Sequence, residues 1–234
     1  MSKILTVYYS RKGENYFPDG IKSVAKGNTA YAAEHIQAAV GGDLFEIDTV
    51  KPYGESYREC VGQSVQEAKA KARPEIKAYV EDMSQYDTIF VCYPCWSGTA
   101  PMCVFTFLEH YDFAGKKIVP LCTNEGSGMA GSVADIKASC PGAEVTEGLS
   151  FRGHQCEAVP KKSGPGLRQT FKYIKMGVRL DSHFSFIHRV RQSAYPCRCG
   201  RNFRTAGRLL IFAGGKCPPA IPRRECLPVC RPIP

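Results

Sequence analysis

Short continuous apolar runs alternate with longer stretches of helical spacing through the first 150 residues. The runs occupy residues 4–9, 44–47, 89–93, 118–121 and 145–151. Runs of this length, bounded by turn residues, are typical of strands that are buried on both faces of a parallel sheet. We therefore predict an α/β fold, in which a doubly wound five-stranded parallel sheet carries helices on both faces.

The stretches between these runs predict helices, and each begins with a residue type that favours helix initiation. The predicted start sites, in chain order, are Asn28 or Thr29, Ser56, Arg73-Pro74, Pro101 and about Ser132. Gly41 and Gly42 end the first helix. The side chains expected to face the core are Ala32, Ala33, Ile36, Ala39, Ile76, Tyr79, Val80, Val104, Phe105, Leu108, Val133 and Ile136.

The first predicted strand ends in a loop that is rich in hydrogen-bond donors. Ser10, Asn28 and Thr29 offer polar side chains, and Gly27 lets backbone N–H groups approach a ligand closely. The N-terminus of the following helix adds its positive dipole, so the loop favours a phosphate. An ordinary capped strand-to-helix turn explains the same residues, and neither a Walker loop nor a dinucleotide-binding glycine motif is present.

Two further loops add an aromatic ring and amide groups. The run 89–93 leads to Pro94 and then to Trp96, the only tryptophan, with Ser97 and Gly98 beside it. A lone tryptophan is also a common core residue. The loop after the fourth run contains Thr123, Gly126, Ser127 and Gly128. Because ligands bind outside the carboxyl ends of parallel strands, the three loops together suit a flavin mononucleotide (FMN).

Seven segments in chain order carry a family resemblance. They are YYSRKGEN, GNTAYAAEHI, DLFEIDTVKPY, ARPEIK, YDTIFVCYPCWSGTAPM, FTFLEHYDFAGKKIVPLCTNEGSGM and DIKASCPGAEV. Residues 1–153 resemble the flavodoxins, in the variety that has an insertion in the phosphate loop. The resemblance implies strand order 2-1-3-4-5 and an FMN-binding domain over residues 1–153.

The resemblance also implies roles for residues in each loop. The phosphate would be held by Ser10, Gly27, Asn28 and Thr29. The isoalloxazine ring would face Pro94, Trp96, Ser97 and Gly98, with Thr123, Gly126, Ser127 and Gly128 along its other edge. Gly98 would be the residue whose backbone reorients when the flavin N5 gains a proton, since glycine makes such a change inexpensive.

Two features depart from the family pattern. Ser97 stands where the family often has tryptophan, and Asn124 stands where it often has histidine. Residues 14–26 separate Ser10 from Gly27. The sequence does not show whether this insertion lies over the ligand or projects away from it.

The charge of the chain divides sharply. Residues 1–150 carry 14 Lys+Arg and 19 Asp+Glu, a net charge of −5, whereas residues 151–234 carry 17 and 3, a net charge of +14. An acidic flavin module without an evident substrate pocket favours an electron carrier that docks on basic redox partner proteins. The alternative is an FMN-dependent NAD(P)H/quinone-type reductase on the same fold.

We expect a cytoplasmic protein with no membrane segment, because no signal peptide and no apolar run of membrane-spanning length are visible.

Most of the cysteines that lie in apolar runs resemble small core residues. Cys92 and Cys95 match the C-x-x-C pattern, but Cys92 would lie inside a buried strand, which argues against a dithiol role.

The basic tail, residues 154–234, is rich in Arg, Cys and Pro and lacks the closing helix expected of the fold. When residues 154–172 are back-translated with degenerate codons and shifted by two bases, they permit a helix-forming segment followed by a stop. Our hypothesis is that the tail is frameshifted and poorly ordered. Resequencing the gene around codon 153 tests it.

The composition of the tail also allows two binding functions. Its cysteines lack the paired C-x-x-C knuckles of a zinc site, and its charge, without a recognised fold, makes nucleic acid an unfavoured partner. A zinc- or nucleic-acid-binding tail on a flavin-free domain remains the competing hypothesis, although these features do not favour it. The residues Leu167, Phe171, Ile174 and Val178 have helical spacing and would partly replace the missing helix.

Overall fold

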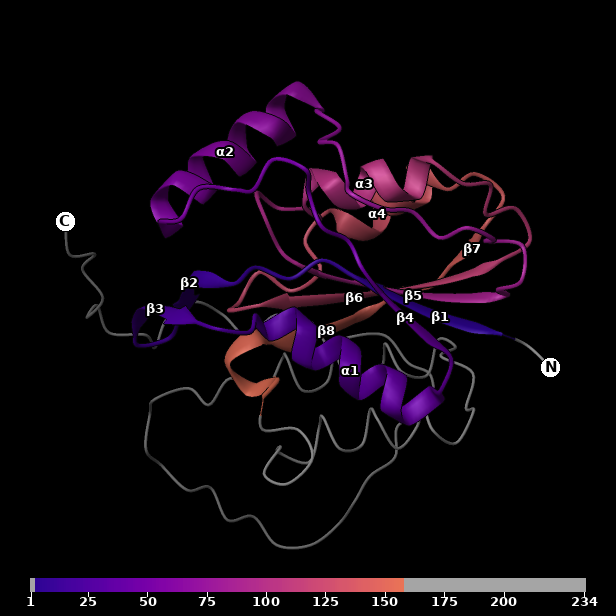
Figure 1. The fold of residues 1–234 in the computed structure, drawn as a ribbon, viewed down its shortest axis with the longest axis horizontal. Helices are drawn as coiled ribbons and strands as arrows, with labels where there is room; N and C mark the ends of the chain where they lie inside the picture. Colours follow the sequence, from indigo (N-terminus) through magenta and orange to yellow (C-terminus); the bar gives the residue numbers. More distant parts are fainter. Residues whose placement is uncertain (1–2, 158–234) are drawn as a thin grey trace, which may run out of the picture. The chain divides into compact units, whose positions relative to one another are not determined.

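A computed structural model describes residues 3–157, so the predictions for residues 158–234 of the tail lie outside the described residues. The described residues form a parallel sheet with helices on both faces (Figure 1). The elements are β1 (Ile4–Tyr8), β2 (Gly13–Phe17), β3 (Gly20–Val24), α1 (Asn28–Val40), β4 (Asp43–Glu46), α2 (Tyr57–Ala70), β5 (Thr88–Pro94), α3 (Met102–Glu109), β6 (Lys117–Asn124), α4 (Ser132–Ser139), β7 (Glu144–Val145), β8 (Leu149–Arg152) and a 3₁₀ turn (Gly153–Gln155).

The sheet has the strand order β4-β1-β5-β6-β7, and β8 also pairs with β6. All of these pairings are parallel. With β7 and β8 counted as the two parts of one fifth strand, the order corresponds to 2-1-3-4-5, so the predicted α/β class and topology are confirmed. The central strands β1, β5 and β6 end side by side, which brings the three predicted loops to one edge of the sheet.

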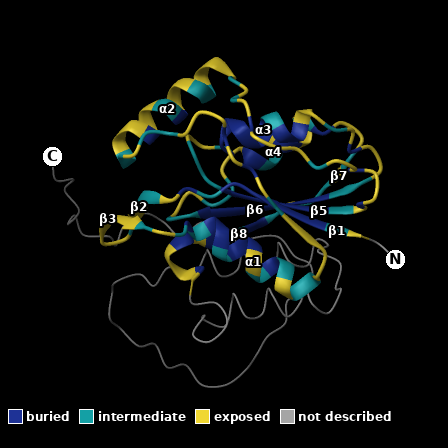
Figure 2. Ribbon diagram, in the orientation of Figure 1, coloured by how far each residue is buried: buried dark blue, intermediate teal, exposed yellow. Residues whose placement is uncertain are grey.

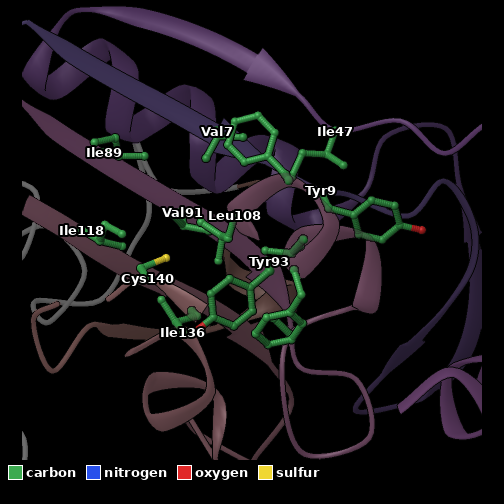
Figure 3. Packing of buried hydrophobic residues seen from close by; sticks show 14 of the residues in the cluster. Val7, Tyr9, Ile47, Ile89, Val91, Tyr93, Leu108, Ile118, Ile136 and Cys140 are labelled. Atoms are coloured by element: carbon green, nitrogen blue, oxygen red, sulfur yellow. The ribbon is translucent and has the colours of Figure 1, made fainter. Parts of the chain in front are cut away.

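Two apolar clusters hold the layers together. One joins Val7 and Val91 to Leu108 of α3 and Ile136 of α4 (Figure 3), and the other joins Cys92 to Ile36 of α1. Because alternate residues of β5 enter opposite clusters, both faces of the strand are buried, as its continuous apolar sequence predicts. Figure 2 shows the contrast between this buried sheet and the largely exposed outer face of α2.

The predicted fifth strand, residues 145–151, is divided into β7 and β8. Val145 pairs with Ile118 and Leu149 pairs with Leu121, while Pro120 of β6 lies opposite the interruption. Proline has no N–H to donate to a ladder. A Cβ on Gly148 would also lie 2.7 Å from the Pro120 carbonyl oxygen. The break therefore follows from a proline in a central strand.

The helix predicted after Arg73-Pro74 is wrong. Residues 73–80 are not helical, and Ile76 forms an antiparallel bridge with Thr49. The Lys77 N–H donates to the Asp48 carbonyl oxygen at 2.8 Å, so a tertiary partner takes the backbone group that a helix would have used. Ile76 is buried as predicted, whereas Tyr79 is 37% exposed.

The insertion forms an antiparallel hairpin of β2 and β3. The Glu14 carboxylate accepts a hydrogen bond from the Tyr57 N–H at 2.7 Å, which links the base of the hairpin to the N-terminus of α2. A carboxylate is favourable there because it meets the positive end of the helix dipole. β3 is largely exposed, whereas Asn15 and Tyr16 of β2 line a cavity described below.

The described chain continues past residue 153. The 3₁₀ turn follows β8, and Cys156 is buried in the cluster of α1. None of the helices among residues 3–157 combines the length and apolar character that crossing a membrane requires. Within the same range, no group of three or more His, Cys, Asp or Glu side chains is arranged to hold a metal ion.

Candidate functional site

The N-terminus of α1 lies at the end of β1, but the cap differs from the prediction. Gly27 is the N-cap residue and neither Asn28 nor Thr29 caps the helix. Ser10 supplies the missing side-chain acceptor, since its hydroxyl oxygen accepts a hydrogen bond from the Ala30 N–H at 3.0 Å. A Cβ on Gly27 would lie 2.2 Å from the Arg11 carbonyl oxygen, so only glycine permits this approach.

Arg11 is a buried cation at this end of the site. Its side chain is 8% exposed and donates hydrogen bonds to the backbone oxygens of Glu14 (2.9 Å), Glu55 (2.8 Å) and Ser56 (3.2 Å). Among residues 3–157, no carboxylate forms an ion pair with Arg11. A buried charge is costly without a counter-charge. The arginine is therefore suited to an anionic ligand that also meets the α1 dipole.

The loop after β5 is a tight turn. The N–H and carbonyl groups of Trp96 and Thr99 bond to each other, both at 2.9 Å. Ser97 and Gly98 lie between them with positive φ of 49° and 81°, the combination typical of a type I′ turn. The Gly98 carbonyl accepts a hydrogen bond from the Gly131 N–H at 2.9 Å, so turning this peptide over would break that bond.

Trp96 is half-buried and has aromatic neighbours behind it. The ring of Tyr53 meets it edge-on at 4.9 Å and that of Tyr9 at 5.3 Å. Edge-to-face packing orients an aromatic ring without covering both of its faces. Burial raises the pKa of Tyr53, and its hydroxyl donates to the Glu67 carboxylate at 2.8 Å. Trp96 therefore packs against these two tyrosines and also forms part of the wall of the cavity described below.

The loop after β6 is organised by Asn124. Its Oδ1 accepts hydrogen bonds from the N–H groups of Gly126 (2.9 Å) and Gly128 (3.0 Å). Its Nδ2 donates to the Ser150 hydroxyl at 2.9 Å and to the Phe151 carbonyl at 3.3 Å. The two glycine donors are therefore engaged within the loop. The Asn124 side chain therefore holds the loop in shape and connects it to β8.

Glu125 of the same loop is held by the chain that follows β8. One of its carboxylate oxygens accepts from the His154 N–H at 2.8 Å, and the other lies 2.6 Å from His154 Nδ1. The hydroxyls of Thr29 and Thr123 lie 2.7 Å apart and join α1 to β6. The threonine contact fixes the first and third loops relative to each other, and the Glu125 contact fixes the third loop to the turn after β8.

The three loops surround a cavity of about 320 Å³ at the carboxyl ends of β1, β5 and β6. Seven of the predicted site residues line it: Asn28, Thr29, Pro94, Trp96, Ser97, Thr123 and Ser127. Five do not line it and instead shape the loops: Ser10, Gly27, Gly98, Gly126 and Gly128. The cavity therefore brings together residues from all three predicted loops.

Sequence reasoning missed several residues of the cavity wall. They are Arg11, Asn15, Tyr16, Tyr57, Cys60, Val61, Ser64, Val65, Cys95, Glu125 and Gly153, while Asn124, noted above as a departure from the family pattern, also lines the cavity. Arg11 directly follows Ser10, so its place at a strand end was a usable signal. The α2 residues gave no comparable signal, because α2 reaches the site only through tertiary contacts such as Ser64 Oγ to Ser97 Oγ, 3.1 Å.

The fold is that of a doubly wound α/β protein with a cavity at the carboxyl edge of its sheet, where proteins of this architecture bind ligands. A model of the flavodoxin family matches residues 21–162. The chain belongs to the flavodoxin family. No curated protein matches it significantly.

Similar solved structures have the same fold. A proposed flavoprotein from Bacteroides eggerthii is 33% identical, with a TM-score of 0.54, and the match covers 68% of this chain and 95% of that one. Another, from Bacteroides uniformis, is 27% identical with a TM-score of 0.55, over 69% and 99% of the two chains. A flavoprotein in complex with FMN from Lactobacillus acidophilus, 21% identical with a TM-score of 0.51 over 68% and 98%, is alike in fold alone.

Proposed function

We propose that this protein binds FMN in the 320 Å³ cavity and carries electrons between redox partner proteins. The observation that carries the proposal is the buried Arg11, which has no carboxylate partner among residues 3–157 and lines a cavity at the N-terminus of α1. A cation and a helix dipole at one end of a partly aromatic cavity suit a ligand that is anionic at one end and planar at the other. FMN is such a ligand and is the cofactor of the flavodoxin family.

In this proposal, each loop binds one part of the cofactor. Arg11 and the first N–H groups of α1 hold the phosphate, with Asn28 and Thr29 beside it and Ser10 and Gly27 supporting the loop. Pro94, Trp96 and Ser97 face the ring, and Thr123 and Ser127 lie along its other edge. Gly98, Gly126 and Gly128 set the backbone of these two loops. FMN supplies the redox chemistry when it is bound, and the chain positions it and limits its contact with water.

Two observations favour a carrier over a reductase. The cavity volume lies near the lower end of the range for small-molecule sites, which leaves little room for a nicotinamide substrate beside the flavin. The net charge of −5 over residues 1–150, the part that carries the cavity, favours docking of this part of the chain on basic partners, whereas residues 151–234 carry +14. The observation that favours an FMN-dependent NAD(P)H/quinone-type reductase is the apolar rim of Val61 and Val65, which are 40% and 50% exposed.

Steady-state kinetics of the FMN-loaded protein distinguish these two functions. A carrier is expected to oxidise NADH and NADPH far more slowly than about 1 s⁻¹, the lower end of ordinary enzyme turnover. After chemical reduction, it should pass electrons to cytochrome c, a one-electron protein acceptor. Rapid NAD(P)H oxidation without a partner protein, together with slow reduction of cytochrome c, would establish the reductase instead.

A further inference from the structure

Trp96 is in contact with two tyrosine rings. It is the only tryptophan of the chain, it is half-buried, and it lines the 320 Å³ cavity (the first cavity). The ring of Tyr53 meets it at a centroid distance of 4.9 Å and an interplanar angle of 87°, and the ring of Tyr9 meets it at 5.3 Å and 79°. Both are edge-to-face contacts. Because electrons pass most readily between aromatic rings in contact, either tyrosine is placed to exchange an electron with Trp96.

The hydroxyl of Tyr53 has a base beside it, whereas that of Tyr9 does not. The Tyr53 hydroxyl donates to the Glu67 carboxylate at 2.8 Å. Among residues 3–157, the other tyrosine hydroxyls that donate to a carboxylate are those of Tyr8, Tyr31 and Tyr86. Tyr9 (Figure 3) therefore has no carboxylate acceptor in this part of the chain. Since removal of an electron makes a phenol strongly acidic, a tyrosine is oxidised easily only where a base takes its proton.

Tyr53 and Glu67 both line a second cavity, of about 490 Å³, which shares no lining residue with the first. Polar side chains make up much of the rest of its wall, and they are Lys51, Gln63, Gln66, Arg73 and Glu75. Several of these residues are exposed, so small solutes can reach this cavity. Burial raises the pKa of Glu67, which makes its carboxylate a stronger base. The Tyr53 side chain therefore links the wall of the first cavity to that of the second.

We propose that Trp96, Tyr53 and Glu67 form a relay that carries a one-electron oxidising equivalent from the first cavity to the second. A one-electron oxidant in the first cavity takes an electron from Trp96. Tyr53 then passes one electron to the Trp96 radical cation and its hydroxyl proton to Glu67. This step leaves an intact tryptophan, a neutral tyrosyl radical and a carboxylic acid. A soluble reductant of the ascorbate class returns one electron to Tyr53 through the second cavity, and Glu67 returns the proton.

The relay is an activity of the chain itself, separate from cofactor binding. Its three side chains and both cavities belong to the described residues, so it does not require FMN. Its effect is to return an oxidised Trp96 to its original form and to move the radical away from the wall of the first cavity. A protein that failed to bind FMN would still show it, and a protein that bound FMN without a relay would lack it.

Pulse radiolysis of the full chain without FMN tests the relay. The azide radical, a one-electron oxidant that attacks indoles faster than phenols, generates the radical on Trp96, the only tryptophan. In the wild type, the absorption of the tryptophan radical should decay as that of a tyrosyl radical rises, at a rate independent of protein concentration. Tyr53→Phe should lose this transfer. Tyr9→Phe is the matched control and should retain it, because it also removes one hydroxyl from a ring in contact with Trp96.

Glu67→Gln separates proton transfer from packing, because glutamine still accepts a hydrogen bond from Tyr53 but is not a base. It should slow the transfer about hundredfold, the usual scale for loss of a positioned base. Added ascorbate should shorten the lifetime of the tyrosyl radical. A wild-type tryptophan radical that decays without a tyrosyl radical would overturn the proposal, whether or not the variants fold. So would wild-type transfer rates in Tyr53→Phe or Glu67→Gln, loss of transfer in Tyr9→Phe, or a radical lifetime that ascorbate leaves unchanged.

Discussion

Gly98 and Gly62 both have open space where a Cβ would lie, but their backbones differ. Gly98 has a φ of +81° in the tight turn of the site, whereas Gly62 lies inside α2. Gly98→Ala should therefore lower the free energy of unfolding by about 1 kcal/mol through backbone strain. Gly62→Ala should raise it by roughly 0.5–1 kcal/mol, because alanine favours the helix. Urea unfolding followed by Trp96 fluorescence measures both, and equal signs would contradict the assigned turn.

The effect of Arg11 on phosphate binding can be separated from its effect on the fold by comparing FMN with riboflavin, which lacks the phosphate. Arg11→Gln should weaken FMN binding at least about tenfold, the effect of losing a charge-assisted contact, and should barely change riboflavin binding. Lys12→Gln is the matched control, because it removes the same charge from a side chain that is 69% exposed. Fluorescence titrations give the dissociation constants. An equal loss for both ligands would show that Arg11 acts on the fold and not on the phosphate.

At the residue scale, the sequence revealed side chains in and beside the loops at the carboxyl ends of the predicted strands. Asn28, Trp96 and Thr123 were found in this way, and all three line the cavity. The surroundings of Arg11 were not predictable, because its acceptors Glu55 and Ser56 are more than 40 residues away in the chain. The part of Asn124 in organising its loop likewise depends on β8, which the local sequence does not specify.

At the scale of elements, α2 illustrates a start that the sequence predicted correctly. The Ser56 hydroxyl accepts from the Glu59 N–H at 3.2 Å, and the Glu59 carboxylate accepts from the Ser56 N–H at 3.3 Å. Ser56→Ala should cost about 1 kcal/mol of unfolding free energy. Ser23→Ala, at an exposed position of β3, should change it by less than about 0.5 kcal/mol. Urea unfolding of both variants is the measurement, and similar costs would mean that the cap is not a source of stability.

Predictions of elements failed where tertiary contacts outweighed the local sequence preference for a helix. The spacing of Ile76, Tyr79 and Val80 suited a helix, but the Thr49 bridge and two hydrogen bonds between Val80 and the Tyr111 hydroxyl hold the segment in another conformation. The sequence showed the insertion as extra residues but did not show where these residues lie relative to the site. Its position follows from Glu14 and Arg11, which attach it to the start of α2.

At the scale of the whole molecule, buried tyrosines make stability depend on alkaline pH. Burial, with the nearby Glu46, raises the pKa of Tyr8 to about 12, and burial also raises that of Tyr93. Below pH 10 these residues are protonated in both states, so their contribution is complete. As pH rises from 10 through 12, the unfolded chain ionises first and the contribution is lost.

For Tyr8 alone, this loss should reach about 2 kcal/mol at pH 12. Urea unfolding at a series of pH values measures it, with absorbance at 295 nm reporting tyrosine ionisation. Tyr8→Phe should make the decline less steep. A free energy of unfolding that stays constant from pH 10 to pH 12 would contradict the burial of these side chains.

The division of the chain into an acidic flavin-binding part, residues 1–153, and a basic tail, residues 154–234, remains our proposal. Its basis is the change of net charge from −5 over residues 1–150 to +14 over residues 151–234. If the proposal is correct, the cofactor site needs no residue of the tail beyond those that secure the third loop. Binding by the full chain is therefore the first property to establish.

Titration of free FMN with the purified full chain tests the central claim most directly. Flavin fluorescence and the visible absorption spectrum report binding to the cavity of Arg11 and Trp96. We predict that fluorescence is quenched in proportion to added protein until one chain is present per FMN, with a shift of the visible bands. Unchanged fluorescence and an unchanged spectrum at an excess of folded protein would show that the cavity is not an FMN site.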